Sequence, residues 1–208
     1  MAVHDVFEAV VQLDDSNIRP LVQAELDTGT AVSVILQEGL IAAMDEVGRR
    51  FSNGDMFVPE MLKAAQVMKE GLVIVKPLLT ESEVPSSGTV VMGTVKGDLH
   101  DIGKNLVAMM MEGGGFTVID LGIDLPAETF VQAAREHQAD VIGISALLTT
   151  TMPAMEETVA LLRGAGIQAK ILVGGAPVTA GFAEKIGADG YGDDAPSAVR
   201  LAKELLLQ

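Results

Sequence analysis

One histidine in this chain stands in a segment that could hold a metal. His100 follows Asp98 by two residues, and Gly97 and Gly103 flank the pair. A neutral imidazole is a good ligand for cobalt and other transition metals. A nearby carboxylate could accept the other ring N–H, which fixes the tautomer and raises the basicity of the metal-binding nitrogen. The glycines would let the backbone pass close to a large ligand. By itself this segment leaves a solvated surface histidine open as the alternative.

Two further segments could join this histidine in one site. Ser145, Leu147, Thr149 and Thr151 follow one apolar run, and the pair Gly174-Gly175 follows another. Taken singly, the hydroxyls could merely satisfy backbone groups at a strand end, and the glycine pair could form a simple turn. In open α/β sheets, however, ligands bind outside the carboxyl ends of the strands. We therefore expect the three segments to meet at one edge of a sheet.

Other kinds of chemistry receive little support from the residues. His4 and His137 are the only other histidines, too few for a zinc site or for a metal phosphohydrolase that begins from the pair His100-Asp101. The chain has no cysteine, which excludes disulfides, thiolate zinc sites and iron–sulfur clusters. It has no Gly-rich dinucleotide or P-loop pattern, and no serine–histidine–aspartate arrangement suggests a hydrolase.

The second half of the chain alternates between strand and helix patterns. The apolar and β-branched runs predict strands at 88–94, 116–121, 140–145, 169–173 and 188–191, with helices at 101–112, 127–137, 152–164, 179–186 and 195–207. Such alternation is typical of a parallel sheet that helices cover on both faces. For five strands we expect the flavodoxin-like (Rossmann-like) order 2-1-3-4-5.

The first half of the chain has the spacing of an antiparallel bundle of about four helices. Two short amphipathic segments cover 5–13 and 17–27, and Thr30 is expected to cap the helix that follows. Two longer apolar faces come next, with Pro59 in the first turn of the second helix. Their residues are Leu36, Leu40, Met44, Val47 and Phe51, and then Met61, Ala65, Met68, Leu72, Val75 and Leu79. We expect a helical cap domain at 1–80, a linker at 81–87 and an α/β domain at 88–208.

The charge of the chain limits its partners. The formal net charge is −15, and so strongly acidic a surface repels phosphate backbones and anionic membranes. We therefore expect neither nucleic acid nor membrane as a partner. The chain shows no signal peptide and no apolar run long enough to span a membrane, and with its lack of cysteine this favours a cytoplasmic location.

Together these segments resemble the cobalamin-binding fingerprint. Its three parts occur here in order, as Asp98-x-His100-x-x-Gly103, then Ser145-x-Leu147, then Gly174-Gly175. The segment from Gly54 to Met61 resembles the cap domain that precedes the B12 domain in methionine synthase. The resemblance covers about residues 5–205. It is nearest to the small corrinoid proteins of methanol, methylamine and methoxyaromatic methyltransferase systems.

The resemblance implies a role for each matching residue. His100 would be the lower axial ligand of cobalt, in place of the cofactor's own base. Asp98 would bond the imidazole, and Thr151 stands where a serine completes this relay in methionine synthase. The loop and the slot for the nucleotide tail would consist of Gly97, Asp98, Leu99, His100, Asp101, Ile102, Gly103, Ser145, Leu147, Thr149, Gly174 and Gly175. From the cap, Phe57, Met61, Ala64, Val67 and Met68 would cover the upper face, with core packing of the methionines as the alternative.

The resemblance further implies a methyl carrier that does not act by itself. Its corrinoid would accept a methyl group on Co(I) from a substrate-specific methyltransferase and deliver it to a second methyltransferase, with tetrahydrofolate or coenzyme M as acceptor. A reductive activator is a further expected partner. The sequence leaves the methyl donor open among methanol, methylamines, betaines and aryl methyl ethers. The alternatives are the small subunit of an adenosylcobalamin mutase, a B12-dependent sensor, and a response-regulator-like domain without a cofactor.

Overall fold

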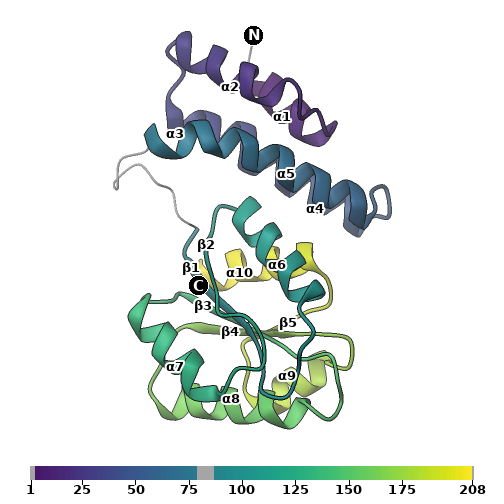
Figure 1. Cartoon of the computed structure of the whole chain (residues 1–208), viewed down its shortest axis with the longest axis vertical. Helices are drawn as coiled ribbons and strands as arrows, with labels where there is room; N and C mark the ends of the chain where they lie inside the picture. Colours follow the sequence, from purple (N-terminus) through teal and green to yellow (C-terminus); the bar gives the residue numbers. More distant parts are fainter. Residues whose placement is uncertain (1–2, 79–86, 208) are drawn as a thin grey trace. The chain divides into compact units, whose positions relative to one another are not determined.

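The computed structural model describes residues 3–78 and 87–207 (Figure 1). The chain divides into two compact units, one made of Met1–Ser86 with Gly113–Gly115 and the other of Ser87–Glu112 with Phe116–Gln208. The first unit is helical, and the second holds a sheet. Apart from Ser87, the linker expected at 81–87 lies outside the described residues, as does Leu79.

The helical unit consists of α1 (Val3–Val11), α2 (Ile18–Asp27), a continuous run of α3 (Val32–Val34), η1 (Ile35–Ile41) and α4 (Ala42–Ser52), then α5 (Val58–Val75) with the 3₁₀ turn η2 (Lys76–Leu78). Helix α5 packs on α1, α2, η1 and α4, and α1 also packs on η1 and α4. The expected helical N-terminal part is therefore confirmed. No helix in the described residues is long and apolar enough to cross a membrane.

The longest predicted apolar face contains an irregularity that the sequence pattern does not show. Residues Ile35–Ile41 form a π-helix, whose hydrogen bonds join residues five apart. Ile35 and Leu40 are five apart, as are Leu36 and Ile41, and all four side chains are buried. The wider turn thus directs two pairs of apolar residues inward, whereas a regular helix would spread them around its surface.

The expected cap at Thr30 is wrong. The residue that precedes α3 is Ala31, and its side chain makes no capping bond. Thr30 instead donates its hydroxyl proton to the buried carboxylate of Glu25, at 2.8 Å. A buried acceptor near the end of α2 therefore competes successfully for this hydroxyl. Pro59 lies in the first turn of α5, as expected.

The second unit is a five-stranded parallel sheet with the order β2-β1-β3-β4-β5, which confirms the predicted topology. Its strands are β1 (Thr89–Thr94), β2 (Thr117–Asp120), β3 (Val141–Ser145), β4 (Lys170–Gly174) and β5 (Gly190–Gly192). Its helices are α6 (Ile102–Gly113), α7 (Ala127–Glu136), α8 (Met152–Gly164), α9 (Ala180–Ile186) and α10 (Ala195–Leu206). Each expected strand and helix is present with small changes at its ends.

Helices cover both faces of this sheet. Figure 1 shows α6 and α10 on one face and α7, α8 and α9 on the other. One apolar cluster joins the sheet to the second group, with Phe130 of α7, Met155 of α8 and Ala183 of α9 packed against Ile142 and other strand residues. Because β1, β3 and β4 lie between two helical layers, they carry nearly continuous apolar runs.

Candidate functional site

The strand register brings the predicted site segments to one edge of the sheet. The last paired residues of the inner strands are neighbours, since Thr94 of β1 pairs with Ser145 of β3 and Ser145 pairs with Gly174 of β4. Gly174 in turn pairs with Gly192 of β5. The loops that follow these residues therefore leave the sheet side by side, as expected for the carboxyl edge.

Asp98 is the centre of this edge and is fully buried. One carboxylate oxygen, Oδ1, accepts the backbone N–H of His100 at 3.1 Å and lies 2.7 Å from the ring nitrogen Nδ1 of His100. The other oxygen, Oδ2, accepts the backbone N–H of Leu147 at 2.7 Å and the hydroxyl of Thr151 at 2.8 Å. The carboxylate thus joins the loop after β1 to the loop after β3.

These donors keep Asp98 ionised. Burial would raise the pKa of its carboxyl, but the N–H groups of Leu147 and His100 and the hydroxyl of Thr151 outweigh burial and hold the pKa well below its usual range. An ionised carboxylate can only accept hydrogen bonds, so Nδ1 of His100 must donate. In the neutral ring this leaves Nε2 with its lone pair available to a metal.

His100 is held in place on one side and open on the other. Its side chain is 50% exposed, although Nδ1 bonds the buried Asp98. The hydroxyl of Thr94, a buried residue at the end of β1, donates to the carbonyl of His100 at 3.0 Å. The loop backbone and one ring nitrogen are therefore fixed by the protein, while the rest of the ring is accessible to a ligand.

Thr151 occupies the third position of the predicted relay. Its hydroxyl oxygen lies 2.8 Å from Asp98 Oδ2 and 2.9 Å from the carbonyl of Leu148. One hydroxyl proton serves one acceptor at a time, so Thr151 shares its proton between them. The bond to Asp98 is present in the structure, and the part it plays in cofactor binding stays a prediction.

The glycines of the site differ in their surroundings. A Cβ at Gly175 would lie 1.9 Å from the carbonyl oxygen of Ala146, and φ is +126° there, so no side chain fits. Gly174 is less crowded, with the nearest atom, the carbonyl oxygen of Gly192, at 3.1 Å from such a Cβ. Gly97 has a φ of +84°. At Gly103 nothing lies within 4 Å, so α6 begins beside open space.

Large apolar side chains lie exposed around His100. Leu99, which precedes it in the loop, and Ile102, the first residue of α6, are 68% and 85% exposed. Leu147 is also exposed, and so is Ile123 in the loop after β2. Among the other predicted site residues, Asp101 and Thr149 are exposed and Ser145 is half-buried. Exposed apolar groups in the loops beside an accessible imidazole suit a large, partly apolar ligand.

The predicted cap residues fall into two groups. Phe57, which precedes α5, is 68% exposed. Met61, Ala64, Val67 and Met68 of α5 are buried in a packed apolar environment. This burial is compatible with the alternative of core packing, and a role for these residues over the cofactor stays a prediction.

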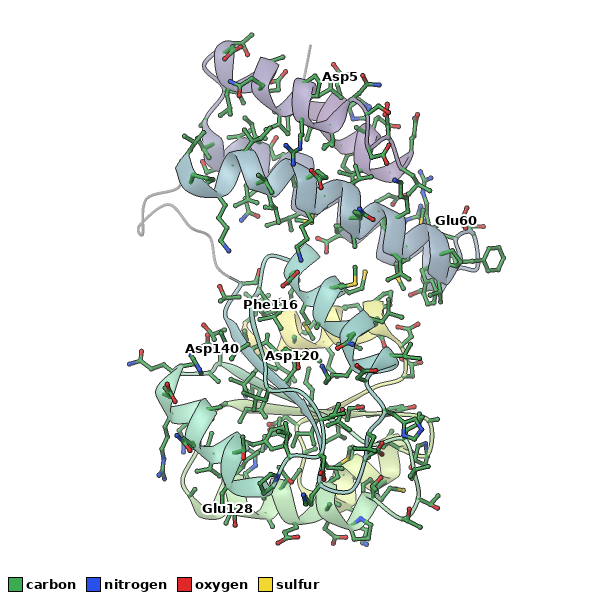
Figure 2. The ribbon with its side chains drawn as sticks, viewed as in Figure 1. Asp5, Glu60, Phe116, Asp120, Glu128 and Asp140 are labelled. Atoms are coloured by element: carbon green, nitrogen blue, oxygen red, sulfur yellow. The ribbon has the colours of Figure 1, made fainter. Side chains whose placement is uncertain are left out.

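The loop after β2 contributes residues that sequence reasoning missed. The carboxylate of Asp124 accepts the backbone N–H of Gly97 at 2.8 Å. Asp120, labelled in Figure 2, ends β2 and binds the ammonium group of Lys104 on α6 at 2.6 and 2.5 Å. The Lys104 side chain is only 1% exposed. Because β2 is parallel to β1 and also ends at the carboxyl edge, its position in the sheet is the signal that could have identified these residues.

The site offers too few ligand atoms for a bare metal ion, but enough for a metal whose other ligands come from a bound macrocycle. The described ranges 3–78 and 87–207 contain no group of three or more histidine, aspartate or glutamate side chains able to hold a metal ion. One imidazole with a free Nε2 would hold a bare ion poorly, but it can complete the coordination of a metal in a macrocycle. The open space at Gly103 and the exposed apolar residues agree with such a ligand.

Comparisons with known proteins identify the family of this chain. Models of the B12 binding domain match residues 88–200 and, in a second form, residues 2–76. A dimethylamine corrinoid protein of Methanosarcina acetivorans is 46% identical over 84% of this chain and 83% of its own length. A trimethylamine corrinoid protein of the same organism is 42% identical over 96% and 94%.

Two solved structures share the fold of this chain. A cobalamin-binding protein from Desulfitobacterium hafniense superimposes with a TM-score of 0.82 at 29% identity, over 98% of both chains. A chain of the methanol:cobalamin methyltransferase complex of Methanosarcina barkeri gives a TM-score of 0.87 at 29% identity, over 99% of this chain and 79% of that one. The chain therefore belongs to the B12-binding corrinoid proteins, and its cofactor is a corrinoid.

Proposed function

We propose that this chain carries methyl groups between two methyltransferases. The observation that carries the proposal is the imidazole of His100, anchored through Nδ1 to the buried Asp98 and open at Nε2. A bound corrinoid would supply a cobalt ion that takes up and releases a methyl group. Relatives named as dimethylamine and trimethylamine corrinoid proteins support this role over other corrinoid chemistries.

The residues of the chain would hold and tune the cofactor. His100 would be the lower axial ligand, and the negative charge on Asp98 would strengthen donation from Nε2. Thr151 would moderate that charge, because its hydroxyl donates to the oxygen of Asp98 that does not face His100. Leu99 and Ile102 would contact the macrocycle through their exposed apolar side chains.

The carboxyl edge also offers a place for the cofactor's nucleotide tail. We place it along Gly103, Ser145, Leu147 and Gly174-Gly175, where the glycines keep the backbone bare. At Gly175 the chain passes so close to Ala146 that any side chain would displace the loop. We assign the upper face of the cofactor to Phe57, Met61, Val67 and Met68.

The partners in this proposal are other proteins. A substrate-specific methyltransferase would load the methyl group, and a second methyltransferase would pass it to tetrahydrofolate or coenzyme M. A reductive activator would restore the cobalt after accidental oxidation. The similar chain in the methanol:cobalamin methyltransferase complex supports docking to a methyltransferase.

The axial ligand is tested by replacing histidines in the full-length chain. His100→Ala and His137→Ala apoproteins are mixed with hydroxocobalamin, and bound corrinoid and visible spectra are measured across pH. His137 is an exposed residue at the end of α7 and serves as the matched control. We expect His137→Ala to match the wild type and His100→Ala to lose the ligand-dependent spectrum. Identical spectra for all three proteins would refute the proposal.

The carrier role needs a separate test. The reduced holoprotein is methylated with ¹³C-iodomethane and then mixed with acceptor methyltransferases and either tetrahydrofolate or coenzyme M. We expect label in one acceptor only when both the chain and its methyltransferase are present. In the loading direction, a panel of methylamines, methanol, betaines and aryl methyl ethers is offered with their methyltransferases, methylamines first. A holoprotein that no pair can load or unload would contradict a carrier role.

A further inference from the structure

The segment after β2 runs alongside the loop that carries His100. Thr94, the last residue of β1, bonds the segment that follows β2. Its N–H donates to the carbonyl of Gly122 at 3.0 Å, and its carbonyl accepts the N–H of Leu125 at 3.1 Å. Val95 and Leu125 form a further parallel bridge. The pairing of β1 with β2 thus continues into both loops and fixes one loop against the other.

Asp124 lies in the middle of this segment and bonds the His100 loop twice. Its carboxylate accepts the N–H of Gly97 at 2.8 Å, and its own N–H donates to the carbonyl of Asp98 at 3.1 Å. It does so with a φ of +55°, a left-handed conformation that is uncommon for a residue with a side chain. Asp and Asn are among the few such residues that tolerate it.

The two bonds restrain a part of the loop that the Asp98 carboxylate leaves free. The bonds to that carboxylate fix a side chain and its donors, but they do not fix the backbone that precedes it. Glycine has the most flexible backbone of all residue types, and Gly97 adopts a φ of +84° here. Within the turn, the N–H of Asp98 donates to the carbonyl of Val95 at 3.2 Å. Asp124 adds a restraint from outside the turn on each side of the peptide that joins Gly97 to Asp98.

We propose that Asp124 is a positioning residue for the axial ligand, which holds the backbone of Gly97 and Asp98 so that His100 points its free nitrogen at the cobalt. The inference rests on the proposed role of His100. Asp124 would act through the backbone of Gly97 and Asp98, to which its hydrogen bonds run.

The nearby lysine contributes little to this restraint. The ammonium group of Lys96 lies 3.0 Å from the Asp124 carboxylate, but the two side chains are 62% and 40% exposed. Exposed ion pairs of this kind are weak because water screens them. The pKa of Asp124 lies below its usual range, chiefly through the Gly97 N–H and then through Lys96. Asp124 therefore accepts the Gly97 bond as a carboxylate at neutral pH.

Four variants separate the effect of the bond from the effects of its surroundings. Asp124→Gly removes the carboxylate and fits the positive φ without strain. Asp124→Asn keeps an acceptor and tolerates the same φ. Asp140→Gly is the matched control, because the Asp140 carboxylate, labelled in Figure 2, accepts the N–H of Thr89 at 2.7 Å at the opposite end of β1. Lys96→Gln tests the ion pair.

The measurements use the full chain with and without hydroxocobalamin. Affinity is titrated by absorption. In protein with ¹⁵N only in its histidines, the ¹⁵N splitting in the electron paramagnetic resonance spectrum after reduction to Co(II) reports the His100 ligand, because the cofactor's own base carries ¹⁴N. In the apoprotein, hydrogen exchange of the Gly97 amide reports the restraint directly. We expect Asp124→Gly to bind about 3- to 10-fold more weakly, to lose part of its nitrogen-split signal and to expose the Gly97 amide. We expect Asp124→Asn and Lys96→Gln to stay within about twofold of the wild type, and Asp140→Gly to keep its affinity.

The outcomes distinguish this inference from the proposed function. A wild type without nitrogen splitting from a histidine would refute the role of His100, and with it the basis of the inference. A wild type with that splitting and an Asp124→Gly variant that matches it in affinity, splitting and exchange would overturn the inference alone. Equal losses in Asp124→Gly and Asp140→Gly would also overturn it, since the effect would then be one of general stability.

Discussion

At each of the two edges of the sheet, an aspartate carboxylate joins two segments of the chain, but the two carboxylates have different donors. At the amino edge, the carboxylate of Asp189 accepts the backbone N–H of Ile171 at 2.6 Å and the guanidinium of Arg163 at 2.6 Å. At the carboxyl edge, Asp98 likewise ties two segments together, but one of its donors is the imidazole of His100. A guanidinium has no lone pair to offer, whereas an imidazole that donates through one nitrogen presents the other. The type of donor therefore distinguishes the two aspartates. Asp189 only stabilises the fold, whereas Asp98 also orients a side chain that can bind a metal.

One glycine at each edge shows a similar difference. At the amino edge, a Cβ at Gly88 would lie 3.0 Å from both Asp140 and Leu206 side chains, so the space is filled by the protein. At the carboxyl edge, Gly103 faces open space. Gly103 lies three residues after His100, so we expect the cofactor to fill this space. Variants at matched positions of the two edges can break or sharpen this contrast.

The largest difference should come from removing the two carboxylates. We expect Asp98→Ala to lower the free energy of unfolding by about 2–3 kcal/mol, because it removes a fully buried acceptor from its donors. Asp189→Ala should lower it by about 1 kcal/mol, because the N–H of Ile171 is only partly buried and the exposed guanidinium of Arg163 keeps its bond to the carbonyl of Gly187. Only Asp98→Ala should weaken corrinoid binding, by about 10- to 100-fold, as loss of a bond behind a metal-ligating histidine does. Urea unfolding of the apoproteins and titration with hydroxocobalamin measure both. A similar loss of affinity in Asp189→Ala would break the comparison.

A methyl group at Gly103 should separate binding from folding. We expect Gly103→Ala to bind hydroxocobalamin roughly 10-fold or more weakly, because the added group enters the space meant for the cofactor. Its apoprotein should keep the stability of the wild type within about 0.5 kcal/mol, since nothing lies within 4 Å of the new atom. Gly181→Ala in α9, which also faces open space, is the control and should change neither quantity. Unaltered affinity in Gly103→Ala would place the cofactor elsewhere.

Acid should weaken the carboxyl edge through Asp98. Because the folded state depresses the pKa of this carboxyl, its contribution to stability is complete above its unfolded value near 4 and is lost as the pH falls toward the folded value. Asp98→Asn should therefore lose about 1–2 kcal/mol less than the wild type between pH 5 and pH 2. Unfolding of the apoproteins at a series of pH values measures the difference. Parallel curves for the two proteins would contradict the ionised state assigned to Asp98.

The smallest effect should come from the two buried threonines of this region. Thr151→Val removes the hydroxyl that bonds Asp98 and keeps the shape of the side chain. We expect about 1 kcal/mol less stability and about a threefold loss of corrinoid affinity. Thr158→Val removes a buried hydroxyl that bonds only the carbonyl of Ala154 within α8, so affinity should stay constant. If both variants bound the corrinoid equally well, Thr151 would have no part in the relay.

The sequence predicts the scaffold of the carboxyl edge better than its details. Periodicity and β-branched runs locate the five strands, and the rule for parallel sheets places the loops of His100, Ser145 and Gly174 together. The bond between Asp98 and His100 follows from their spacing. The two bonds of Asp124 do not, because they depend on a backbone that reverses at a positive φ and on a partner 27 residues away in the chain. The π-helix at Ile35–Ile41 escapes prediction for a similar reason, since helical periodicity assumes a regular turn.

The most direct test of the account identifies the nitrogen bound to cobalt. The chain is produced with ¹⁵N only in its histidines, loaded with hydroxocobalamin and reduced to Co(II), and its electron paramagnetic resonance spectrum is compared with that of unlabelled protein. The account predicts a triplet splitting in the unlabelled protein that becomes a doublet on labelling, and no such doublet in labelled His100→Ala. A triplet that persists in the labelled protein would show that the cofactor's own base binds the metal, and the role assigned to His100 would be wrong.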